Sequence, residues 1–424
     1  MDKIRIRGGK ALRGKVEISG SKNAALPVLI ASLLTEKKCH FRRVPNLQDI
    51  RTTLKVLSHL GVSLGSESSL NQNQVELTAA IPASSDGFHE APYDLVRTMR
   101  ASVLVLGPLL ARFGRAKVSL PGGCAIGARP INYHLFGLER LGAEIALEGG
   151  YVIARAKKLQ GAKIVFEFPS VGATENVMMA AALARGESIL ENCAREPEIV
   201  DLARALRAMG LQIEGEGTET IRIQGRDSLN GCTHEIIGDR IEAGTFLAAG
   251  LGSGGSVEVM GIAPEFLEAV LVKFEEAGAT VERKPDSIVI TANGRPKATD
   301  IITQPYPGFP TDMQAQFMTV MTIAEGTSVI TENIFENRFM HVPELSRLGA
   351  EITIRGNNAM VRGQAGLVGA PLMATDLRAS ASLVLGGLFA RGETIVNRIY
   401  HLDRGYERME EKLAGLGADI ERIR

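Results

Sequence analysis

The sequence contains no tryptophan, and only 5% of its 424 residues are aromatic. Ala, Leu, Val and Ile must therefore fill most of the interior. Net charge is also absent, because 48 Lys and Arg residues balance 48 Asp and Glu residues. A formal charge of zero argues against a nucleic-acid-binding protein that depends on bulk electrostatics. An anion-binding site must come from local clusters of basic side chains.

Cysteine is scarce, and the four cysteines form no Cys-x-x-Cys pair: they are Cys39, Cys124, Cys193 and Cys232. In a chain of this length, such spacing is typical of a reduced cytoplasmic protein rather than of a disulfide framework or a zinc site. The N-terminal residues lack the apolar core of a signal peptide. The longest uncharged run, residues 243–257, has 15 residues, whereas a membrane span needs roughly 20. We expect a cytoplasmic protein without a membrane span.

One short pattern recurs six times along the chain: an apolar helix end, a glycine and an alternating strand. The six glycines are Gly61, Gly142, Gly210, Gly278, Gly349 and Gly417, spaced 81, 68, 68, 71 and 68 residues apart. Each glycine suits the left-handed position just past a helix. Upstream residues such as Leu202, Leu206 and Met209 show the spacing of an amphipathic helix.

Six runs of small apolar residues recur in step with these glycines, at 24–34, 101–111, 173–184, 243–250, 315–324 and 379–390. Helices that are apolar all round are buried. The repeat therefore predicts a strand, a buried helix, a strand, an outer helix and a strand. Solenoid repeats are shorter, typically about 20–45 residues. We expect the six units to form two globular bodies of three units each.

The loop 121–130 (Pro-Gly-Gly-Cys-Ala-Ile-Gly-Ala-Arg-Pro) carries a lone thiol, Cys124, among three glycines. Glycine permits backbone conformations that let a loop fold over a ligand and open again. A free thiol has a pKa of about 8.5, so Cys124 can act as a general acid at neutral pH. A nearby cation such as Arg129 would instead favour a nucleophilic thiolate. A small buried cysteine beside a surface turn is the third interpretation.

Polar and charged residues stand at the start of each apolar run: Lys22-Asn23, Arg97 with Arg100, 174–176, Asp239-Arg240, Thr311-Asp312 and 376–378. Helix N-termini present free N–H groups and a positive dipole end, so added Lys or Arg makes an anion cradle. Taken alone, each charge fits a solvated helix start better than a binding site. The sixfold recurrence favours a shared cleft. Asp312 is either an N-cap or a base at the cleft edge, and Arg338 and Arg404 are either site residues or structural ion pairs.

Together these stretches resemble the UDP-N-acetylglucosamine enolpyruvyl transferase (1-carboxyvinyltransferase) family of peptidoglycan synthesis. The resemblance runs nearly end to end. It rests on residues 19–27, 98–102, 121–130, 170–174, 309–316, 335–338, 375–378 and 403–405.

The resemblance implies an α/β (α+β) fold of two inside-out barrels. Each domain would contain three pseudo-repeated units with buried helices surrounded by sheets. One discontinuous catalytic domain would span residues 1–20 and 233–424, and residues 21–232 would form a second domain that carries the Cys124 lid loop. The small-molecule substrates, phosphoenolpyruvate and UDP-N-acetylglucosamine, would bind between the domains, without a metal or cofactor. A covalent phosphoenolpyruvate adduct on Cys124 is possible, and no nucleic acid, membrane or obligate protein partner is expected.

The resemblance also assigns residue roles. Cys124 matches the general acid, which is open to a phosphoenolpyruvate-like epoxide such as fosfomycin, and Asp312 matches the base on the sugar 3-hydroxyl. Lys22, Arg129 and Arg404 match the residues that bind phosphate and carboxylate, and Lys22 and Arg404 are counted with the catalytic set. The other expected substrate-binding residues are Asn23, Arg100, Pro130, Ile131, Asn132, Tyr133, Ser170, Val171, Gly172, Ile334, Arg338 and Arg378. Some members carry a lysine where this chain has Phe168, so its loop offers no lysine to the diphosphate.

Two alternatives remain at this point. The related shikimate 3-phosphate enolpyruvyl transferases share the fold and chemistry, although the Cys124 loop and residues 170–174 fit the UDP-sugar branch. A catalytically silent nucleotide-sugar-binding paralogue is the second alternative. The presence of Cys124, Asp312 and Arg404 argues against it.

Overall fold

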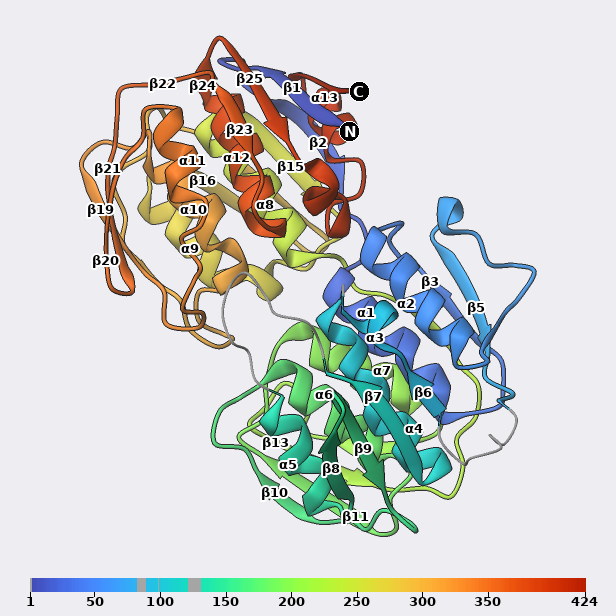
Figure 1. Ribbon diagram of the computed structural model, residues 1–424. Coiled ribbons are helices and arrows are strands. Elements are labelled where there is room, and N and C mark those ends of the chain that lie inside the picture. Colours follow the sequence, from blue (N-terminus) through green and yellow to red (C-terminus); the bar gives the residue numbers. More distant parts are fainter. Residues whose placement is uncertain (1, 82–88, 98, 121–130) are drawn as a thin grey trace. The chain divides into compact units, whose positions relative to one another are not determined.

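The computed structural model describes residues 2–81, 89–97, 99–120 and 131–424. These residues form two units, which Figure 1 colours along the sequence. Unit 1 contains residues 2–19 and 238–424, and unit 2 contains the described residues between 20 and 237.

The strand β14 (Thr233–Glu235) decides where unit 2 ends. It pairs in parallel with β3 (Cys39–Arg42), so that Thr233 lies beside His40. Residues 233–237 therefore belong to unit 2, whereas the expected boundary followed residue 232. A strand of three residues is too short for its alternation to be read from the sequence.

Each repeat folds as one four-stranded sheet with a helix on its inner side. A representative repeat consists of β10 (Lys163–Val165), α6 (Val171–Ala181), β11 (Glu187–Glu191), α7 (Pro197–Ala208), β12 (Gln212–Glu214) and β13 (Thr220–Gln224). The sheet order is β10-β11-β13-β12, with the first pair parallel and the others antiparallel. Parallel neighbours need a crossover connection, and the buried helix α6 supplies it.

Five of the six repeats end on a hairpin of two strands, where the sequence pattern predicted a single strand, and the last ends on the single strand β26 (Asp419–Ile423), as predicted. In one repeat β8 (Glu144–Glu148) pairs with β9 (Tyr151–Arg155) across a two-residue turn. The turn residues Gly149 and Gly150 have φ values of 58° and 82°. Two-residue hairpin turns with positive φ at both central positions match the strand twist, which explains why two glycines stand there.

The remaining strands of unit 2 are β4 (Ser63–Leu64), β5 (Gln74–Thr78), β6 (His89–Ala91) and β7 (Arg115–Ser119). Its other sheets have the orders β14-β3-β5-β4 and β6-β7-β9-β8. In unit 1 the sheets are formed by β1 (Lys3–Arg7), β2 (Arg13–Glu17), β15 (Ser256–Met260), β16 (Thr280–Lys284), β17 (Ser287–Thr291), β18 (Ile301–Ile302), β19 (Thr327–Thr331), β20 (Glu351–Arg355), β21 (Asn358–Arg362), β22 (Leu367–Val368), β23 (Pro371–Met373), β24 (Ala390–Arg391), β25 (Glu393–Asn397) and β26 (Asp419–Ile423).

The N-terminal strands complete sheets of unit 1 that are otherwise built by the second half of the chain. The strand β1 lies between β25 and β26, antiparallel to both. The strand β2 pairs in parallel with β15. This pairing explains why unit 1 is discontinuous in sequence.

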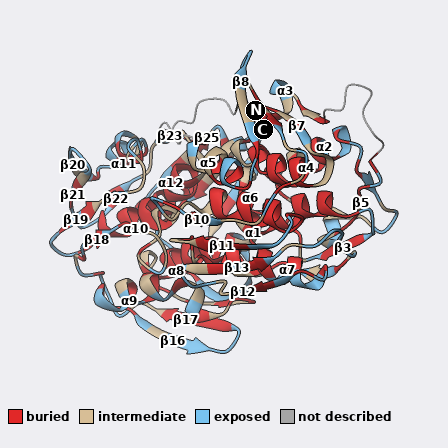
Figure 2. Cartoon of the chain, turned by 90° about the horizontal axis from the view of Figure 1, so that it is seen from below, coloured by how far each residue is buried: buried red, intermediate tan, exposed pale blue. Residues whose placement is uncertain are grey.

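The buried helices are α1 (Lys22–Ala31), α4 (Leu106–Phe113), α6, α8 (Arg240–Gly252), α10 (Gln314–Met321) and α12 (Leu377–Phe389). Figure 2 shows these helices in the colour of buried residues. Small residues let them approach closely: a Cβ added to Gly107 would lie 2.3 Å from Oδ1 of Asn176. The run at 101–111 begins as a 3-10 turn, η3 (Arg100–Val105), before α4. None of the described helices combines the length and the apolar character that crossing a membrane requires.

The outer helices are α2 (Gln48–His59), α5 (Asn132–Arg140), α7, α9 (Glu268–Glu276), α11 (Val342–Arg347) and α13 (Met409–Gly415), with the short helix α3 (Tyr93–Val96) in addition. The six repeat glycines that follow them have φ values between 92° and 97°. This left-handed conformation is the reason for glycine at the helix end. The predicted fold class, with helices inside and sheets outside, is confirmed.

Candidate functional site

The carboxylate of Asp312 is the centre of a charged cluster in unit 1. Asp312 lies in the 3-10 turn η5 (Thr311–Met313), immediately before α10. Its Oδ1 accepts a hydrogen bond from Nη2 of Arg338 at 2.7 Å, and its Oδ2 accepts one from Nη2 of Arg378 at 2.8 Å. The residue that precedes this turn is Pro310, and no side chain caps it. The N-cap interpretation of Asp312 is therefore wrong.

The two arginines are buried, whereas the Asp312 side chain is 27% exposed. Burial alone would lower the pKa of Arg378, but the Asp312 carboxylate raises it, and the net pKa lies above its ordinary value. A buried guanidinium needs an anion beside it, because its desolvation is costly. The site thus holds two fixed cations around one partly open carboxylate. Planar guanidinium groups match carboxylate and phosphate groups well.

Buried side chains next to this cluster form a hydrogen-bond network with it. The Nε2 of Gln316 donates to the Asp312 carbonyl oxygen at 2.9 Å and to the Tyr406 hydroxyl at 3.1 Å. The Tyr406 hydroxyl also lies 2.9 Å from Oγ1 of Thr245 and accepts from Nη1 of Arg378 at 3.4 Å. Burial raises the pKa of Tyr406, so the phenol stays neutral.

No role was predicted from the sequence for Tyr406, Gln316 or Thr245. Two of them lie in or next to stretches that carry the family resemblance: Gln316 stands in the stretch 309–316, and Tyr406 directly follows the stretch 403–405. Their function depends on contacts between residues far apart in the chain, which no spacing pattern encodes.

The predicted residues Arg404 and Ile334 lie on the same unit. Arg404 ends the 3-10 turn η6 (Ile399–Arg404) and is half-buried. Burial and the Arg404 cation lower the pKa of the neighbouring His401. Ile334 follows β19 and lines a surface hollow of about 490 Å³ together with Phe335 and Asn357.

Asp376 positions Arg378 through the backbone. Its Oδ1 accepts hydrogen bonds from the backbone N–H groups of Arg378 at 2.9 Å and Ala379 at 3.1 Å, which caps α12. A side-chain cap satisfies N–H groups that the helix leaves unpaired. Arg378 therefore occupies the first turn of a well-defined helix.

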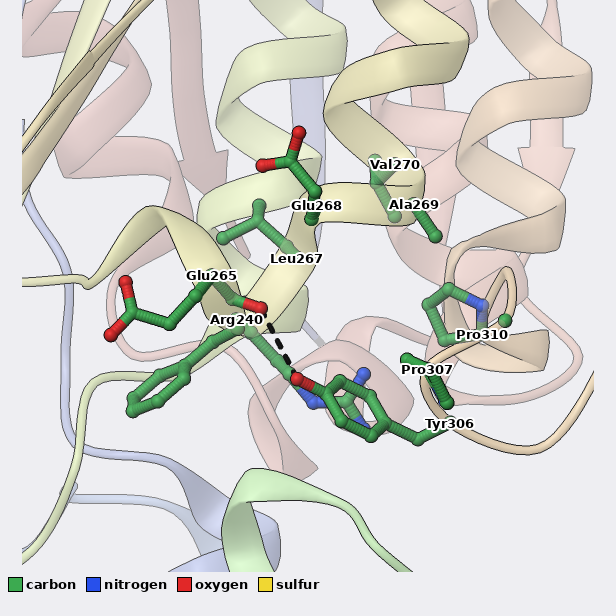
Figure 3. Close-up of a pocket in the computed structure, with 11 residues that line it drawn as sticks. Arg240, Glu265, Leu267, Glu268, Ala269, Val270, Tyr306, Pro307 and Pro310 are labelled. Atoms are coloured by element: carbon green, nitrogen blue, oxygen red, sulfur yellow. Dashed lines mark hydrogen bonds between the residues drawn. The ribbon is translucent and has the colours of Figure 1, made fainter. Parts of the chain in front are cut away.

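A small pocket lies beside the segment that leads to Asp312. Figure 3 shows Arg240, at the start of α8, next to the ring of Tyr306. The guanidinium carbon lies 5.7 Å from the ring centroid, and the Tyr306 hydroxyl donates to the Glu265 carbonyl oxygen at 3.1 Å. The pocket encloses about 20 Å³, room for about one water molecule. It is too small for a substrate.

In unit 2, Lys22 is the first residue of α1, and the side chain of Ser21 caps that helix. Lys22 is 9% exposed, and its Nζ lies 3.5 Å from Oδ2 of Asp49 in α2. Asn23 follows in the same helical turn, and Arg100 begins η3. Both are half-buried. Lys22 and Arg100 thus stand at helix starts, as expected for anion-binding residues.

The structure brings two further predicted groups together at the starts of α5 and α6. Ile131 precedes α5, which begins with Asn132 and Tyr133. Ser170 caps α6, whose first residues are Val171 and Gly172.

The helices α5 and α6 are in contact near these starts. Nδ2 of Asn176 in α6 lies 3.1 Å from Nδ1 of His134 in α5. A Cβ on Gly172 would lie 3.1 Å from the His134 ring. The two helix starts that carry the predicted residues therefore lie side by side in unit 2.

Cys124, Arg129 and Pro130 lie outside the described residues. The other three cysteines are free and buried, and burial raises the pKa of Cys193 to about 12. Within the described ranges, His, Cys, Asp and Glu side chains do not gather in the groups of three that a metal ion would need.

Comparison with known proteins places this geometry in a family. A family model described as EPSP synthase (3-phosphoshikimate 1-carboxyvinyltransferase) matches residues 6–413. The chain is 58% identical to the UDP-N-acetylglucosamine 1-carboxyvinyltransferase of Geobacter metallireducens over 424 residues, with 100% of both chains covered. The protein of the same name from Idiomarina loihiensis is 56% identical, again over 100% of both chains.

Solved structures agree with this assignment. The enolpyruvyl transferase NikO from Streptomyces tendae has a TM-score of 0.87 and 25% identity, over 99% of this chain and 98% of its own. EPSP synthase from Acinetobacter baumannii shares the fold, with a TM-score of 0.76 and 19% identity over 100% of both chains. Fold and family model together define an enolpyruvyl (1-carboxyvinyl) transferase, and hence an enzyme. Within this class, the chain belongs to the UDP-N-acetylglucosamine 1-carboxyvinyltransferase family.

Proposed function

We propose that this enzyme transfers the enolpyruvyl group of phosphoenolpyruvate to the 3-hydroxyl of UDP-N-acetylglucosamine, with release of phosphate. In the cytoplasm this would be the first committed step of peptidoglycan synthesis. The observation that carries the proposal is the Asp312 carboxylate held between the buried Arg338 and Arg378. The 58% identity over the whole chain to proteins of that name supports the choice of substrate.

The reaction is an addition followed by an elimination. A proton added to the methylene carbon of phosphoenolpyruvate creates cationic character at the neighbouring carbon, where the sugar oxygen attacks and loses its proton. A proton then leaves the new methyl group, and the carbon–oxygen bond to phosphate breaks. One carbon–oxygen bond forms and one breaks, so the chemistry needs an acid, a base and cations for the anionic substrates.

Asp312 would be the base on the 3-hydroxyl. In the structure the Arg338 and Arg378 guanidiniums donate to its carboxylate, and nearby cations stabilise the ionised form and weaken it as a base. A phosphate or carboxylate group of a substrate would compete for the same N–H donors. Substrate binding would then draw the arginines away from Asp312 and strengthen the base when it is needed.

Cys124 would be the acid, and a covalent phosphoenolpyruvate adduct on its sulfur is part of this proposal. Lys22, Arg129 and Arg404 would hold the phosphate and carboxylate groups. The surface at the starts of α5 and α6, with Arg100 and Asn23, would bind the sugar nucleotide. Closure of the site would exclude water, which competes with the sugar hydroxyl. We expect these steps to take place without a metal or cofactor.

Phosphate release from phosphoenolpyruvate tests the proposal directly. We expect release with UDP-N-acetylglucosamine, no release with shikimate 3-phosphate, and loss of release in Cys124→Ala. Release only with shikimate 3-phosphate would instead favour the activity named for the matching family model, 3-phosphoshikimate 1-carboxyvinyltransferase. No release with either acceptor, despite binding of the sugar nucleotide, would indicate a silent binding protein.

Thiol alkylation by fosfomycin tests the acid separately. We expect peptide mass mapping to find the adduct on Cys124 and not on the buried Cys39, Cys193 or Cys232. Cys124→Asp should keep turnover and resist alkylation, because a carboxylic acid can also donate the proton. Loss of turnover in Cys124→Asp would contradict the general-acid role.

A further inference from the structure

The carboxylate of Glu332 ties three segments of unit 1 together. Glu332 follows β19 and is 4% exposed. Its Oε1 accepts hydrogen bonds from Oγ1 of Thr303 at 2.9 Å and from the backbone N–H groups of Ile334 at 2.8 Å and Phe335 at 3.1 Å. Its Oε2 accepts one from Oγ1 of Thr311 at 2.8 Å. These four donors are neutral groups, so this carboxylate is held by directed hydrogen bonds rather than by an ion pair.

Two of these segments carry residues of the candidate site. Thr311 directly precedes Asp312 in η5. Ile334 and Phe335 begin the turn that leads to Arg338, whose guanidinium carbon lies 5.4 Å from the centroid of the Phe335 ring. One carboxylate therefore connects the backbone that carries Asp312 with the backbone that carries Arg338.

The third segment anchors this connection to a sheet. Thr303 directly follows β18, which pairs with β19. Its Oγ1 donates to Glu332 and also accepts a hydrogen bond from the backbone N–H of Asn333 at 2.9 Å. The turn after β19 is thus fixed at two points, and its position relative to the sheet is well defined.

We propose that Glu332 is a positioning residue that sets the distance between Asp312 and Arg338. Glu332 acts through the backbone of Thr311 and of the turn at residues 333–335. This inference rests on the proposed role of Asp312 as the base. A displacement of about 1 Å of a reacting group can reduce turnover by about 100-fold, so the Thr311 tie matters for the rate.

The test compares two replacements of Glu332. In Glu332→Gln the amide oxygen can still accept from Ile334 and Phe335, and the amide group can donate to the Thr311 hydroxyl. We expect kcat within about threefold of wild type. Glu332→Asp keeps the charge but is one methylene shorter, so its carboxylate cannot reach Thr311 and the turn at residues 333–335 at the same time. We expect kcat to fall at least about tenfold, with KM for phosphoenolpyruvate within about threefold.

The pH profile separates positioning from a general loss of structure. In Glu332→Asp the Asp312 carboxylate lies farther from Arg338, which raises the pKa of that carboxylate. The acidic limb of kcat/KM should therefore move to higher pH in Glu332→Asp and stay in place in Glu332→Gln. A purely structural role would lower the melting temperature without moving this limb.

Thr311→Val is the second variant, for use if Glu332→Asp does not fold. It removes only the hydroxyl that joins the Asp312 segment to Glu332, and we expect the same loss of kcat. Thr291→Val is its matched control, because Thr291 is also half-buried and its hydroxyl lies 2.8 Å from Oγ of Ser256, outside the cluster. We expect wild-type kcat for that control.

Failure of the positioning role can be distinguished from failure of the proposed function. If the wild type is active and Glu332→Asp or Thr311→Val keeps the wild-type kcat and pH profile, the positioning role is overturned and the proposed function stands. A folded wild type without turnover would overturn the proposed function, and with it the role given to Glu332.

Discussion

The two units place an amide side chain at the same point of their repeats, with different consequences. Asn176 in unit 2 and Gln316 in unit 1 each stand ten residues before the glycine that follows the buried helix, Gly186 and Gly326. Both are buried. Equivalent scaffold positions thus carry related polar groups.

Their partners differ. Asn176 accepts from the Gly107 N–H at 2.8 Å and donates to the Val103 carbonyl oxygen at 3.3 Å, so it joins α6 to neighbouring backbone. Gln316 instead donates to the Tyr406 hydroxyl and to the Asp312 carbonyl oxygen. The amide of unit 2 serves packing, whereas the amide of unit 1 supports a charged site.

Acidic residues show the same contrast. Asp312 in unit 1 is paired with two guanidiniums. Glu175 in unit 2 is 4% exposed, and burial, together with Glu198 and Glu196, raises its pKa well above the ordinary value. A carboxylate between two cations and a buried carboxyl group beside two other acidic residues stand in different electrostatic environments, which indicates different tasks. The comparison predicts that acid–base chemistry belongs to Asp312 and not to Glu175.

The largest expected effect is that of Asp312→Asn on turnover. The amide cannot accept the hydroxyl proton, so kcat should fall by about 100- to 10,000-fold. Phosphate release under saturating substrates measures it, and circular dichroism checks that the variant is folded. A kcat within tenfold of wild type would break the comparison, because unit 1 would then lack the base.

The matched pair Gln316→Ala and Asn176→Ala should separate catalysis from packing. Asn176→Ala leaves the buried Gly107 N–H without its acceptor, so we expect a loss of about 1–3 kcal/mol in unfolding free energy. Its kcat should stay within about threefold of wild type. Gln316→Ala should lower kcat about tenfold, because the Asp312 backbone and the Tyr406 hydroxyl lose their shared donor. Urea unfolding and steady-state kinetics measure both. Equal kcat values for the two variants would contradict the contrast.

A smaller effect is expected from His341 in unit 1. Burial lowers its pKa to about 4, with Asp376 raising it and Arg338 lowering it. The unfolded chain binds a proton to this histidine below about pH 6.5, whereas the folded protein does not. Stability is therefore lost as the pH falls, by about 2 kcal/mol between pH 7.5 and pH 5.

The variant His341→Gln isolates this contribution. Its unfolding free energy, measured in urea at both pH values, should fall by about 2 kcal/mol less than that of wild type. Identical pH dependence in the two proteins would show that the pKa of His341 is the same in the folded and the unfolded chain.

The smallest effect is expected for Glu175→Gln. An amide resembles a neutral carboxylic acid, so below about pH 4.5 the replacement should change the unfolding free energy by no more than about 1 kcal/mol, and it should leave kcat near wild type. Because the raised pKa makes the folded protein bind more protons than the unfolded chain, wild-type stability declines as the pH rises above 4.5. The variant should lack this decline. A large loss of turnover in Glu175→Gln would place acid–base chemistry in unit 2 and contradict the contrast between the two units.

Several features were predictable because they depend on local chemistry. The repeat glycines follow from the left-handed end of each outer helix, and the buried helices follow from runs without polar faces. The hairpin at the end of the first five repeats was missed, although Gly149-Gly150 is a turn signal. The end of unit 2 was missed because β14 is a strand only through its pairing with β3.

The candidate site was predictable only in part. Resemblance pointed to Asp312, Arg338 and Arg378, but it did not state that they contact one another. Glu332 carried no signal, since a lone acidic residue after a strand normally lies in solvent. Its burial results from the donors that surround it.

The scaffold of this protein follows from local patterns in its sequence: six repeats, their buried and outer helices, and the motif positions of the family. Which charges meet depends instead on how the chain folds. Asp312 contacts arginines that are 26 and 66 residues away in the chain. Periodicity follows from the geometry of each helix and strand and can be read locally. Electrostatic partners depend on distances in space, which exist only after the sheets and crossovers have brought the separate segments together.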